Sequence, residues 1–302
     1  NWQVHSDDEI RDLVDRGRDR GVSTWLWYNS GGPNNAVPEA PRDRMFEREV
    51  RRAELATIAD WGVAGVKVDF FHSDKPPIID LMWEILEDAA DARIMVNFHG
   101  CNIPRGWNRT WPHLMTQEGV RGAEQYGFAE TWPETAVWHN TVLPFTRNAI
   151  GPMDYTPVAL SDQLFPRLTS VMHEVALAVV FESGVQHFAD SPESYLGLPD
   201  HVSDLLRALP DTWDETRLVS GRPGSHAVIA RRRKGRWFIG GISAKVDVDV
   251  EIDLAAFDGA TNATLIEDGP NDAPTASTFA IESDHPMWVR IPARGGFTLE
   301  LV

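Results

Sequence analysis

The feature that most constrains the fold is a repeating order of short apolar runs and amphipathic helical segments, which continues to about residue 210. Strand, helix and strand at this spacing predict parallel strands that are joined by helical crossovers. The helical segments that we expect are 7–21, 45–62, 77–93 and 168–183. The strand candidates are 22–32, 63–71, 94–100, 113–119, 141–146 and 185–190.

Polar side chains end or directly follow these strand candidates, namely Asn29, Asp69, His99, Glu118, Arg147 and Asp190. In a parallel barrel such positions collect at the carboxyl ends of the strands, where active sites form. A doubly wound sheet is the alternative, but it usually carries a Gly-rich phosphate turn, and this sequence has none. Because a closed (β/α)8 barrel needs eight strands, we predict a TIM-type barrel over residues 1–212 whose first two strands would precede residue 1.

The pattern changes near residue 213 to short strands without long helices between them. The candidates are 225–233, 236–243, 246–254, 262–269 and 287–302. Gly, Asn, Asp and Pro separate these runs, which is typical of an antiparallel β-sandwich. We therefore expect a C-terminal β-sandwich domain over residues 213–302, and we see no candidate chemistry in it.

Charge and composition exclude several classes of partner. The formal net charge of −17 disfavours nucleic acid and anionic lipid as ligands. No run of about 18 apolar residues predicts a membrane span. The single cysteine, Cys101, excludes an internal disulfide and Cys-rich zinc sites. An acidic, Lys-poor surface suits the salty cytoplasm of a halophile, whereas a high-GC genome would equally explain the Arg bias, so location stays open between cytoplasm and export.

The run 65-GVKVDFFHSD-74 places charges where a buried strand is expected. Alternation puts Lys67 and Asp69 on one face of that strand, with Val66, Val68 and Phe70 on the other. Burying a charged pair costs several kcal/mol per ion before pairing recovers a part of it. A functional role therefore explains Asp69 better than its structural alternatives, a strand-end cap or an ion pair with Lys67.

Two acids flank a glycine-containing loop in 113-HLMTQEGVRGAEQY-126. Together with Asp69, Glu118 and Glu124 could supply the carboxylate pair of a glycosidase, in which one acid attacks and the other protonates the leaving group. Converging carboxylates could instead bind Ca²⁺, or both glutamates could be exposed loop residues. The spacing alone leaves these three interpretations open.

The segment 94-IMVNFHGCNIPRGWNRTWP-112 combines aromatic rings with planar hydrogen-bond donors. Asn97 and His99 fall on one face of the strand, and the following loop is rich in Trp, Arg and Asn. Such a set suits a sugar, whose C–H faces stack on rings while its hydroxyls take hydrogen bonds. An ordered loop over a packed Trp is the structural alternative.

Other catalytic classes have weaker signals. A transition-metal centre could draw on His72, Asp74, His187 and Asp190, but no H-x-H or HExxH spacing supports it. Neither a GxSxG elbow nor a phosphate-binding loop is present, which disfavours acyl transfer and nucleotide chemistry.

Several long motifs, taken in order, resemble glycoside hydrolase family 97, whose members hydrolyse α-glucosides and α-galactosides. These motifs are WLWYNSGG, GVKVDFF, VNFHGC-x-x-PRGW-x-RT, QEGVRGAEQY, LPFTRNAIGPMDYTP and FESGVQHFADSPESY. The resemblance runs from about residue 8 to the C-terminus. It implies an N-terminal β-sandwich, a central (β/α)8 barrel and a C-terminal β-sandwich, of which this chain would lack the first domain and two barrel strands.

The resemblance also implies roles for individual residues. Inverting members carry a glutamate base directly after the His of the strand motif, where this chain has Gly100 after His99. The match is therefore to the retaining branch, with Asp69 as nucleophile and Glu124 as general acid/base. Glu118 and Glu124 resemble calcium ligands. The candidate substrate contacts are Trp27, Asn29, Lys67, His99 and Arg121.

These expectations together predict a retaining, exo-acting α-galactosidase that uses Ca²⁺ and acts on α-linked oligosaccharides or glycosides. The alternatives are an α-glucosidase on the same scaffold and a carbohydrate-binding protein without activity. For retention, we expect the carboxyl groups of Asp69 and Glu124 to lie about 5–5.5 Å apart, whereas inversion would need about 6.5–9.5 Å.

Overall fold

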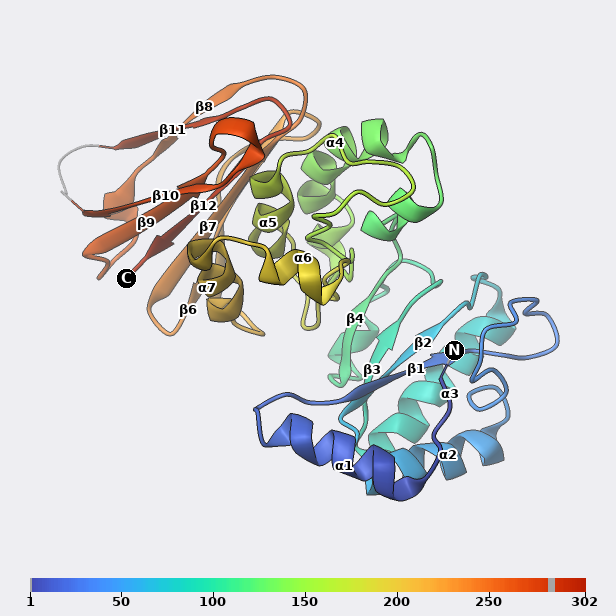
Figure 1. The fold of residues 1–302 in the computed structure, drawn as a ribbon. Coiled ribbons are helices and arrows are strands. Elements are labelled where there is room, and N and C mark those ends of the chain that lie inside the picture. The colour runs from blue at the N-terminus through green and yellow to red at the C-terminus, as the bar shows by residue number, and fades with distance from the viewer. Residues whose placement is uncertain (1, 282–285) are drawn as a thin grey trace. The chain divides into compact units, whose positions relative to one another are not determined.

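The structure is a computed structural model that describes residues 2–281 and 286–302 (Figure 1). The chain forms two compact units, Asn1–Val120 and Arg121–Val302. The first is an α/β unit, and the second combines helices with antiparallel sheets. Within the described ranges, no helix is both long and apolar enough to cross a membrane.

The first unit alternates helices and strands, as the sequence predicts. Its elements are α1 (Asp7–Arg18), β1 (Trp25–Asn29), α2 (Arg48–Asp60), β2 (Gly65–Asp69), α3 (Pro76–Ala92), β3 (Met95–Phe98), η1 (Trp107–Arg109) and β4 (Leu114–Gln117). The strands form one parallel sheet in the order β1-β2-β3-β4. The first four predicted strands and the helices between them are therefore confirmed.

Local chemistry explains where these helices begin and end. The Ser6 hydroxyl caps α1 by accepting a hydrogen bond from the Glu9 N–H, and acidic residues fill the first turn while arginines fill the last. Helix α3 begins with two prolines, whose missing N–H groups are not needed at a helix start. It ends at Ala92, and the next residue, Arg93, adopts a left-handed conformation.

The core of the first unit lies under one face of the parallel sheet. Val66 and Val68 are fully buried and belong to the same apolar cluster as Leu55 of α2 and Ile85 of α3. Lys67 and Asp69 are only half-buried, which confirms that they share the other face. The prediction that Phe70 continues the strand is wrong, because β2 ends at Asp69 and Phe70 has a left-handed φ of 67°.

The helical part of the second unit begins with η2 (Ala123–Gly127). Its other helices are α4 (Trp132–Val142), η3 (Leu143–Phe145), η4 (Asn148–Ile150), α5 (Val171–Val180), α6 (Pro192–Leu196) and α7 (Asp200–Ala208). The strands that follow are β5 (Glu215–Arg222), β6 (His226–Arg233), β7 (Arg236–Ser243), β8 (Val248–Ile252), β9 (Asn262–Glu267), β10 (Thr275–Ala280), β11 (Met287–Ile291) and β12 (Gly296–Leu301), with η5 (Leu254–Ala256) and η6 (Pro270–Asp272) between them.

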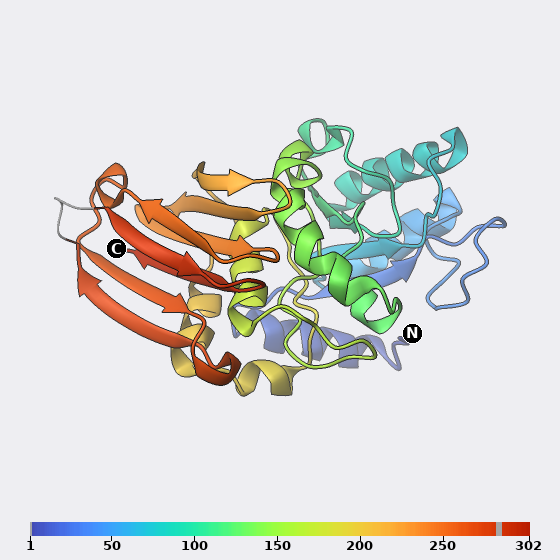
Figure 2. The same ribbon diagram turned by 90° about the horizontal axis from the view of Figure 1, so that it is seen from above.

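The C-terminal strands form antiparallel sheets, as predicted (Figure 2). One sheet has the order β10-β9-β12-β7-β6-β5, and β11 pairs with β8 in a second. An apolar cluster joins Trp237 of the large sheet with Val250 and Val289 of the small one. Helix α5 packs against β7, where a side chain on Gly240 would lie 2.9 Å from Val179 Cβ. Glycine at this position therefore permits the close approach of helix and sheet.

Two predicted strands are wrong. Residues 141–146 belong to the end of α4 and to η3, because Pro144 cannot donate to a strand ladder and the buried face of α4 has helical spacing. Residues 185–190 have no strand either. Their N–H groups bond elsewhere, that of His187 to the Asp154 carboxylate and that of Ala189 to the Pro157 carbonyl. These bonds tie two irregular segments together without a ladder.

The described residues contain four parallel strands and no closed barrel. The compact units divide after residue 120. The predicted boundary between a barrel domain over 1–212 and a sandwich domain over 213–302 stays a prediction.

Candidate active site

Asp69 lies at the carboxyl end of β2, and hydrogen bonds hold both of its carboxylate oxygens. The Phe70 N–H donates to Oδ1 at 2.7 Å, and the Trp27 indole N–H donates to Oδ2 at 3.2 Å. Trp27 lies on β1 opposite Lys67 of β2, which pairs in turn with Asn97 of β3. The parallel register therefore gathers an indole, an ammonium group and an amide on the face that carries Asp69.

Asn29, at the end of β1, organises the loop that follows it. The side chain is fully buried, and its amide donates to the carbonyls of Val37 and Glu39, both at 3.0 Å. Its Oδ1 accepts from the Gly31 N–H and from the Asn35 side chain. These bonds explain why the amide is buried, and the predicted substrate contact of Asn29 stays a prediction.

His99 and Glu118 lie at the ends of the next two strands. His99 is 1% exposed, and its Nδ1 lies 3.8 Å from Glu118 Oε1. The other carboxylate oxygen of Glu118 accepts the Gly100 N–H at 2.7 Å. Glu118, which directly follows β4, therefore holds the backbone turn that follows β3. This hydrogen bond also keeps the Glu118 carboxylate close to His99.

A cavity of about 630 Å³ opens between the loops that follow β1 and β2. It is lined on one side by loop residues around Asn34 and by Phe46, and on the other by Phe70, His72 and Lys75. Aromatic rings beside amide and ammonium donors suit a sugar or a ring-bearing aglycone. Phe70 directly follows Asp69 in the chain, so the cavity lies next to the candidate nucleophile.

Glu124 lies on the short helix η2 of the second unit. Its backbone N–H bonds to the Thr156 hydroxyl at 3.3 Å, while the Ala123 N–H bonds to the Tyr155 carbonyl at 3.0 Å. Arg121 is exposed, with its guanidinium over the Trp132 ring. Residues 155–156 therefore fix the backbone at Ala123 and Glu124 through hydrogen bonds. The Arg121 guanidinium instead makes a cation–π contact with Trp132.

Thr156 has an unusual backbone for a β-branched residue, with a φ of 56° and 3% exposure. Such a conformation costs about 1–3 kcal/mol and persists only where the surroundings impose it. The Thr156 hydroxyl also donates to the Tyr155 carbonyl at 2.6 Å. The strained backbone of Thr156 lies in the segment that holds Glu124, and such strain is common beside functional residues.

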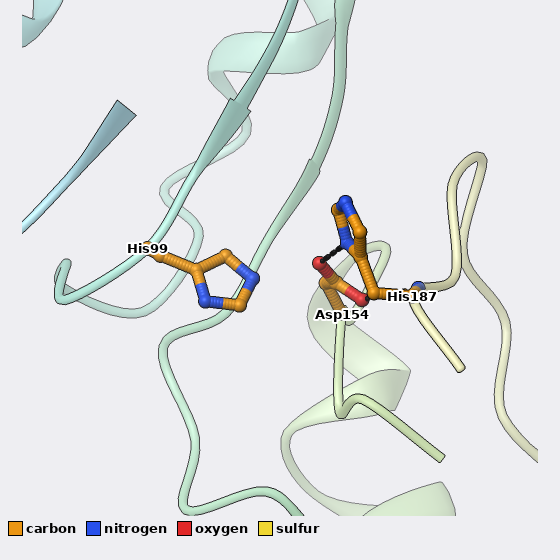
Figure 3. A group of neighbouring side chains, drawn as sticks. All are labelled: His99, Asp154 and His187. Carbon is orange, nitrogen blue, oxygen red and sulfur yellow. Dashed lines mark hydrogen bonds and ion pairs between the residues drawn. The ribbon is translucent and has the colours of Figure 1, made fainter. Parts of the chain in front are cut away.

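Asp154 and His187 form a pair in the second unit that the sequence does not predict. Figure 3 shows the His187 ring facing the Asp154 carboxylate, with Nδ1 and Oδ2 2.6 Å apart. The His187 backbone N–H also bonds to Asp154, whose side chain is fully buried. Since a carboxylate accepts hydrogen bonds, Nδ1 carries the ring proton. No spacing rule connects residues so far apart in the chain, so packing alone reveals the pair.

Asp190 has a structural role that makes its predicted use in a metal centre unnecessary. It accepts hydrogen bonds from the backbone of Leu160 and from the backbone and side chain of Ser161. Burial alone would raise the pKa of this carboxyl, but the hydrogen bonds from Ser161 and Ser194 outweigh it and lower the pKa to about 2. Asp190 therefore ties two loops together as a permanently charged acceptor.

A buried acid, Glu174 of α5, lies beneath the turn that carries Glu124. It accepts the Thr169 hydroxyl at 2.5 Å and the Tyr126 hydroxyl, and Tyr126 belongs to η2. Burial raises the pKa of Glu174 to about 7. Its neighbour His173 has a pKa that burial lowers to about 4.

Glu174→Gln should remove a pH dependence of stability. The carboxyl has a pKa of 4.5 in the unfolded chain and about 7 in the folded one. Its stabilising contribution is complete below pH 4.5 and is lost as the pH rises to about 7. Between these values, the free energy of unfolding should fall by about 3 kcal/mol more in the wild type than in the variant. Chemical denaturation across this range measures it, with the exposed Glu251→Gln as control. Parallel curves for wild type and E174Q would contradict the assignment.

Comparison with known proteins shows which family the sequence belongs to. The sequence model described as Glycoside hydrolase 97 matches residues 2–120. A second, described as Glycosyl-hydrolase 97 C-terminal, oligomerisation, matches residues 212–302, so the two together match more than half of the chain. This chain belongs to glycoside hydrolase family 97.

Two curated relatives of this family 97 chain have similar names. A probable retaining α-galactosidase of Streptomyces bingchenggensis is 39% identical over 297 residues, which are 98% of this chain and 43% of the relative. A retaining α-galactosidase of Bacteroides thetaiotaomicron is 29% identical over 315 residues, which are 99% of this chain and 45% of the relative. The chain spans less than half the length of these relatives.

A solved β-arabinopyranosidase is similar in structure, with a TM-score of 0.90 and 31% identity over 97% of this chain and 48% of the other. Structural similarity within family 97 indicates a TIM-barrel-like catalytic region followed by antiparallel sheets. The resemblance to family 97 is confirmed, whereas the predicted roles of single residues stay predictions.

Proposed function

We propose that this chain carries the catalytic residues of a retaining, exo-acting α-galactosidase. The observation that carries the proposal is Asp69 at the end of β2, with a donor on each carboxylate oxygen and with glycine, not glutamate, after His99. The names of the curated relatives support it. Asp69 is the nucleophile in this proposal and Glu124 the general acid/base.

The reaction has two displacements at the anomeric carbon. An Asp69 oxygen forms a bond to C1 while the bond from C1 to the aglycone oxygen breaks, and Glu124 gives its proton to that oxygen. Water then attacks C1, Glu124 takes a proton from the water, and the bond between C1 and Asp69 breaks. Two inversions release galactose with the α configuration of the substrate.

Lys67, His99, Trp27, Asn29 and Arg121 are proposed to assist this reaction as contacts to the substrate or to the nucleophile. Lys67 shares the face of β2 with Asp69, and His99 directly follows β3, the neighbouring strand. We also propose that β1–β4 belong to a (β/α)8 barrel, which the parallel order of adjacent strands supports.

Calcium is a further proposal. Glu118 and Glu124 would offer carboxylate oxygens, which are the ligands that Ca²⁺ prefers. The hydrogen bond from the Gly100 N–H to Glu118 is compatible with this role, because a carboxylate has about four acceptor sites. When bound, the ion would supply a fixed positive charge beside the acid/base.

A β-arabinopyranosidase is the second candidate, since a solved structure of that name is 31% identical. A β-L-arabinopyranoside has the ring configuration of an α-D-galactoside and lacks only the hydroxymethyl group at C5. An α-glucoside instead differs in the configuration at C4. The space around C5 would therefore decide between the first two substrates, and a donor near O4 would exclude the third.

Steady-state rates of the full-length protein on the 4-nitrophenyl glycosides of these three sugars test the proposal. We expect the highest kcat/KM for the α-galactoside, and NMR should show the α-anomer of galactose first. A higher value for the arabinoside or the glucoside would reassign the substrate. Early β-anomer would reject retention, and no turnover of any of the three would favour a carbohydrate-binding role.

A further inference from the structure

The turn after β2 is held by residues outside its own strand. The backbone carbonyl of Asp69 accepts the Ser30 N–H at 2.8 Å. The next carbonyl, that of Phe70, accepts the Ser30 hydroxyl and the Asn35 side chain. The Trp27 ring packs edge-on against the Phe70 ring, with centroids 5.7 Å apart. Ser30 and Asn35 therefore fix the backbone of Asp69 and Phe70 through their two carbonyl groups.

Gly100 closes this turn from the other side. Its carbonyl accepts the His72 N–H at 2.7 Å, and its own N–H is bound by Glu118. A Cβ at position 100 would lie 2.7 Å from the Phe70 nitrogen and 3.0 Å from Asp69 Oδ1. The Phe70 nitrogen is itself one of the two donors to Asp69. Any side chain at position 100 would therefore displace the carboxylate or its donor.

We propose that Trp27 and Gly100 are positioning residues for Asp69: Trp27 holds Oδ2 through its indole N–H, and Gly100 leaves the space that the Asp69–Phe70 turn needs. This inference rests on the proposed function of Asp69. It gives Trp27 a role different from the predicted substrate contact. A donor on each oxygen orients the carboxylate toward one direction of attack, and it also stabilises the carboxylate when it leaves C1.

An isosteric replacement isolates the indole N–H. 3-Benzothienylalanine at position 27 keeps the ring shape and removes the donor. The readout is the rate at which 5-fluoro-α-D-galactosyl fluoride labels Asp69, followed by intact mass and peptide mapping. Without the indole donor the carboxylate can turn away from its direction of attack, which should slow labelling about ten- to hundredfold, with the reagent's binding constant unchanged. The same replacement at Trp83, which is 47% exposed, is the control.

The possible outcomes separate the two proposals. If Asp69 is labelled in the wild type, and labelling is slow in the position 27 variant but not in the position 83 control, the result supports both the proposed function and the role of Trp27. Equal labelling rates for wild type and that variant overturn the role of Trp27. If the reagent labels no Asp69 in the wild type, the proposed function fails, and the inference fails with it.

Gly106→Ala is a matched control for Gly100→Ala. Both glycines have a left-handed φ, 52° at Gly100 and 79° at Gly106, but a methyl group at position 106 meets nothing within 4 Å. The two variants therefore share the backbone strain and differ in the collision with Phe70. We expect G100A to be labelled about a hundredfold more slowly than G106A. Equal rates would overturn the steric role of Gly100, while the position 27 experiment stands even if G100A does not fold.

Discussion

Asp69→Gly should reduce turnover of 4-nitrophenyl α-D-galactopyranoside on the order of 10⁵-fold, because the group that forms the bond to C1 is lost. Azide should restore much of this rate, since the space left by the side chain admits a small anion. Azide then forms the bond to C1 as the phenolate departs. The product should be β-galactosyl azide, which NMR identifies, because the anion attacks from the face that Asp69 occupies.

Asp74→Gly provides the control for this result. Asp74 lies in the same segment after β2 and is exposed, so its loss should leave turnover unchanged and azide without effect. An Asp69→Gly protein that keeps most of its activity would reject Asp69 as the nucleophile. Formation of α-galactosyl azide would place the attacking group on the opposite face of the sugar, and it would also contradict the assignment.

Glu124→Gln should have an effect that depends on the leaving group. A general acid contributes about 10²–10⁴-fold when the departing oxygen needs a proton. We expect a loss of this size in kcat/KM for phenyl α-D-galactopyranoside. The 2,4-dinitrophenyl galactoside should lose little, because its phenolate departs without a proton. A series of aryl galactosides therefore measures the role as a steeper dependence of log(kcat/KM) on the acidity of the phenol.

The control for this series is Glu130→Gln, which changes an exposed glutamate a few residues away. It should reproduce the wild-type dependence on the leaving group. An equal loss on activated and unactivated substrates for Glu124→Gln would indicate a binding or structural role. The proton donor would then have to be sought among other acids of the site.

The first half of the fold could be predicted because its signals are local. The strands that end at Asn29 and Asp69 combine an apolar run with an α-helix on each side, and the strand that ends at Phe98 directly follows such a helix. Alternation alone placed Lys67 and Asp69 on the face opposite Val66 and Val68. Such patterns depend on neighbouring residues only, so the structure formed from them can be predicted without knowing the distant contacts.

The predicted strands at 141–146 and 185–190 failed for the opposite reason. Both runs are apolar enough for a strand, but 141–146 continues a buried helix, and the N–H groups of His187 and Ala189 bond to Asp154 and Pro157. An apolar run indicates that a segment is buried, but it does not indicate which groups will form hydrogen bonds with its backbone N–H and C=O groups.

The sequence by itself determined the family, the parallel order of the first strands and the candidate nucleophile, because motif and periodicity are properties of neighbouring residues. Only the tertiary structure decided that Trp27 and Phe70 share the Asp69 carboxylate, that Gly100 must lack a side chain and that Asp154 holds His187. These contacts, apart from that of Phe70, join residues about 30 or more positions apart. Packing of whole elements creates them, and no local spacing encodes a distance between elements.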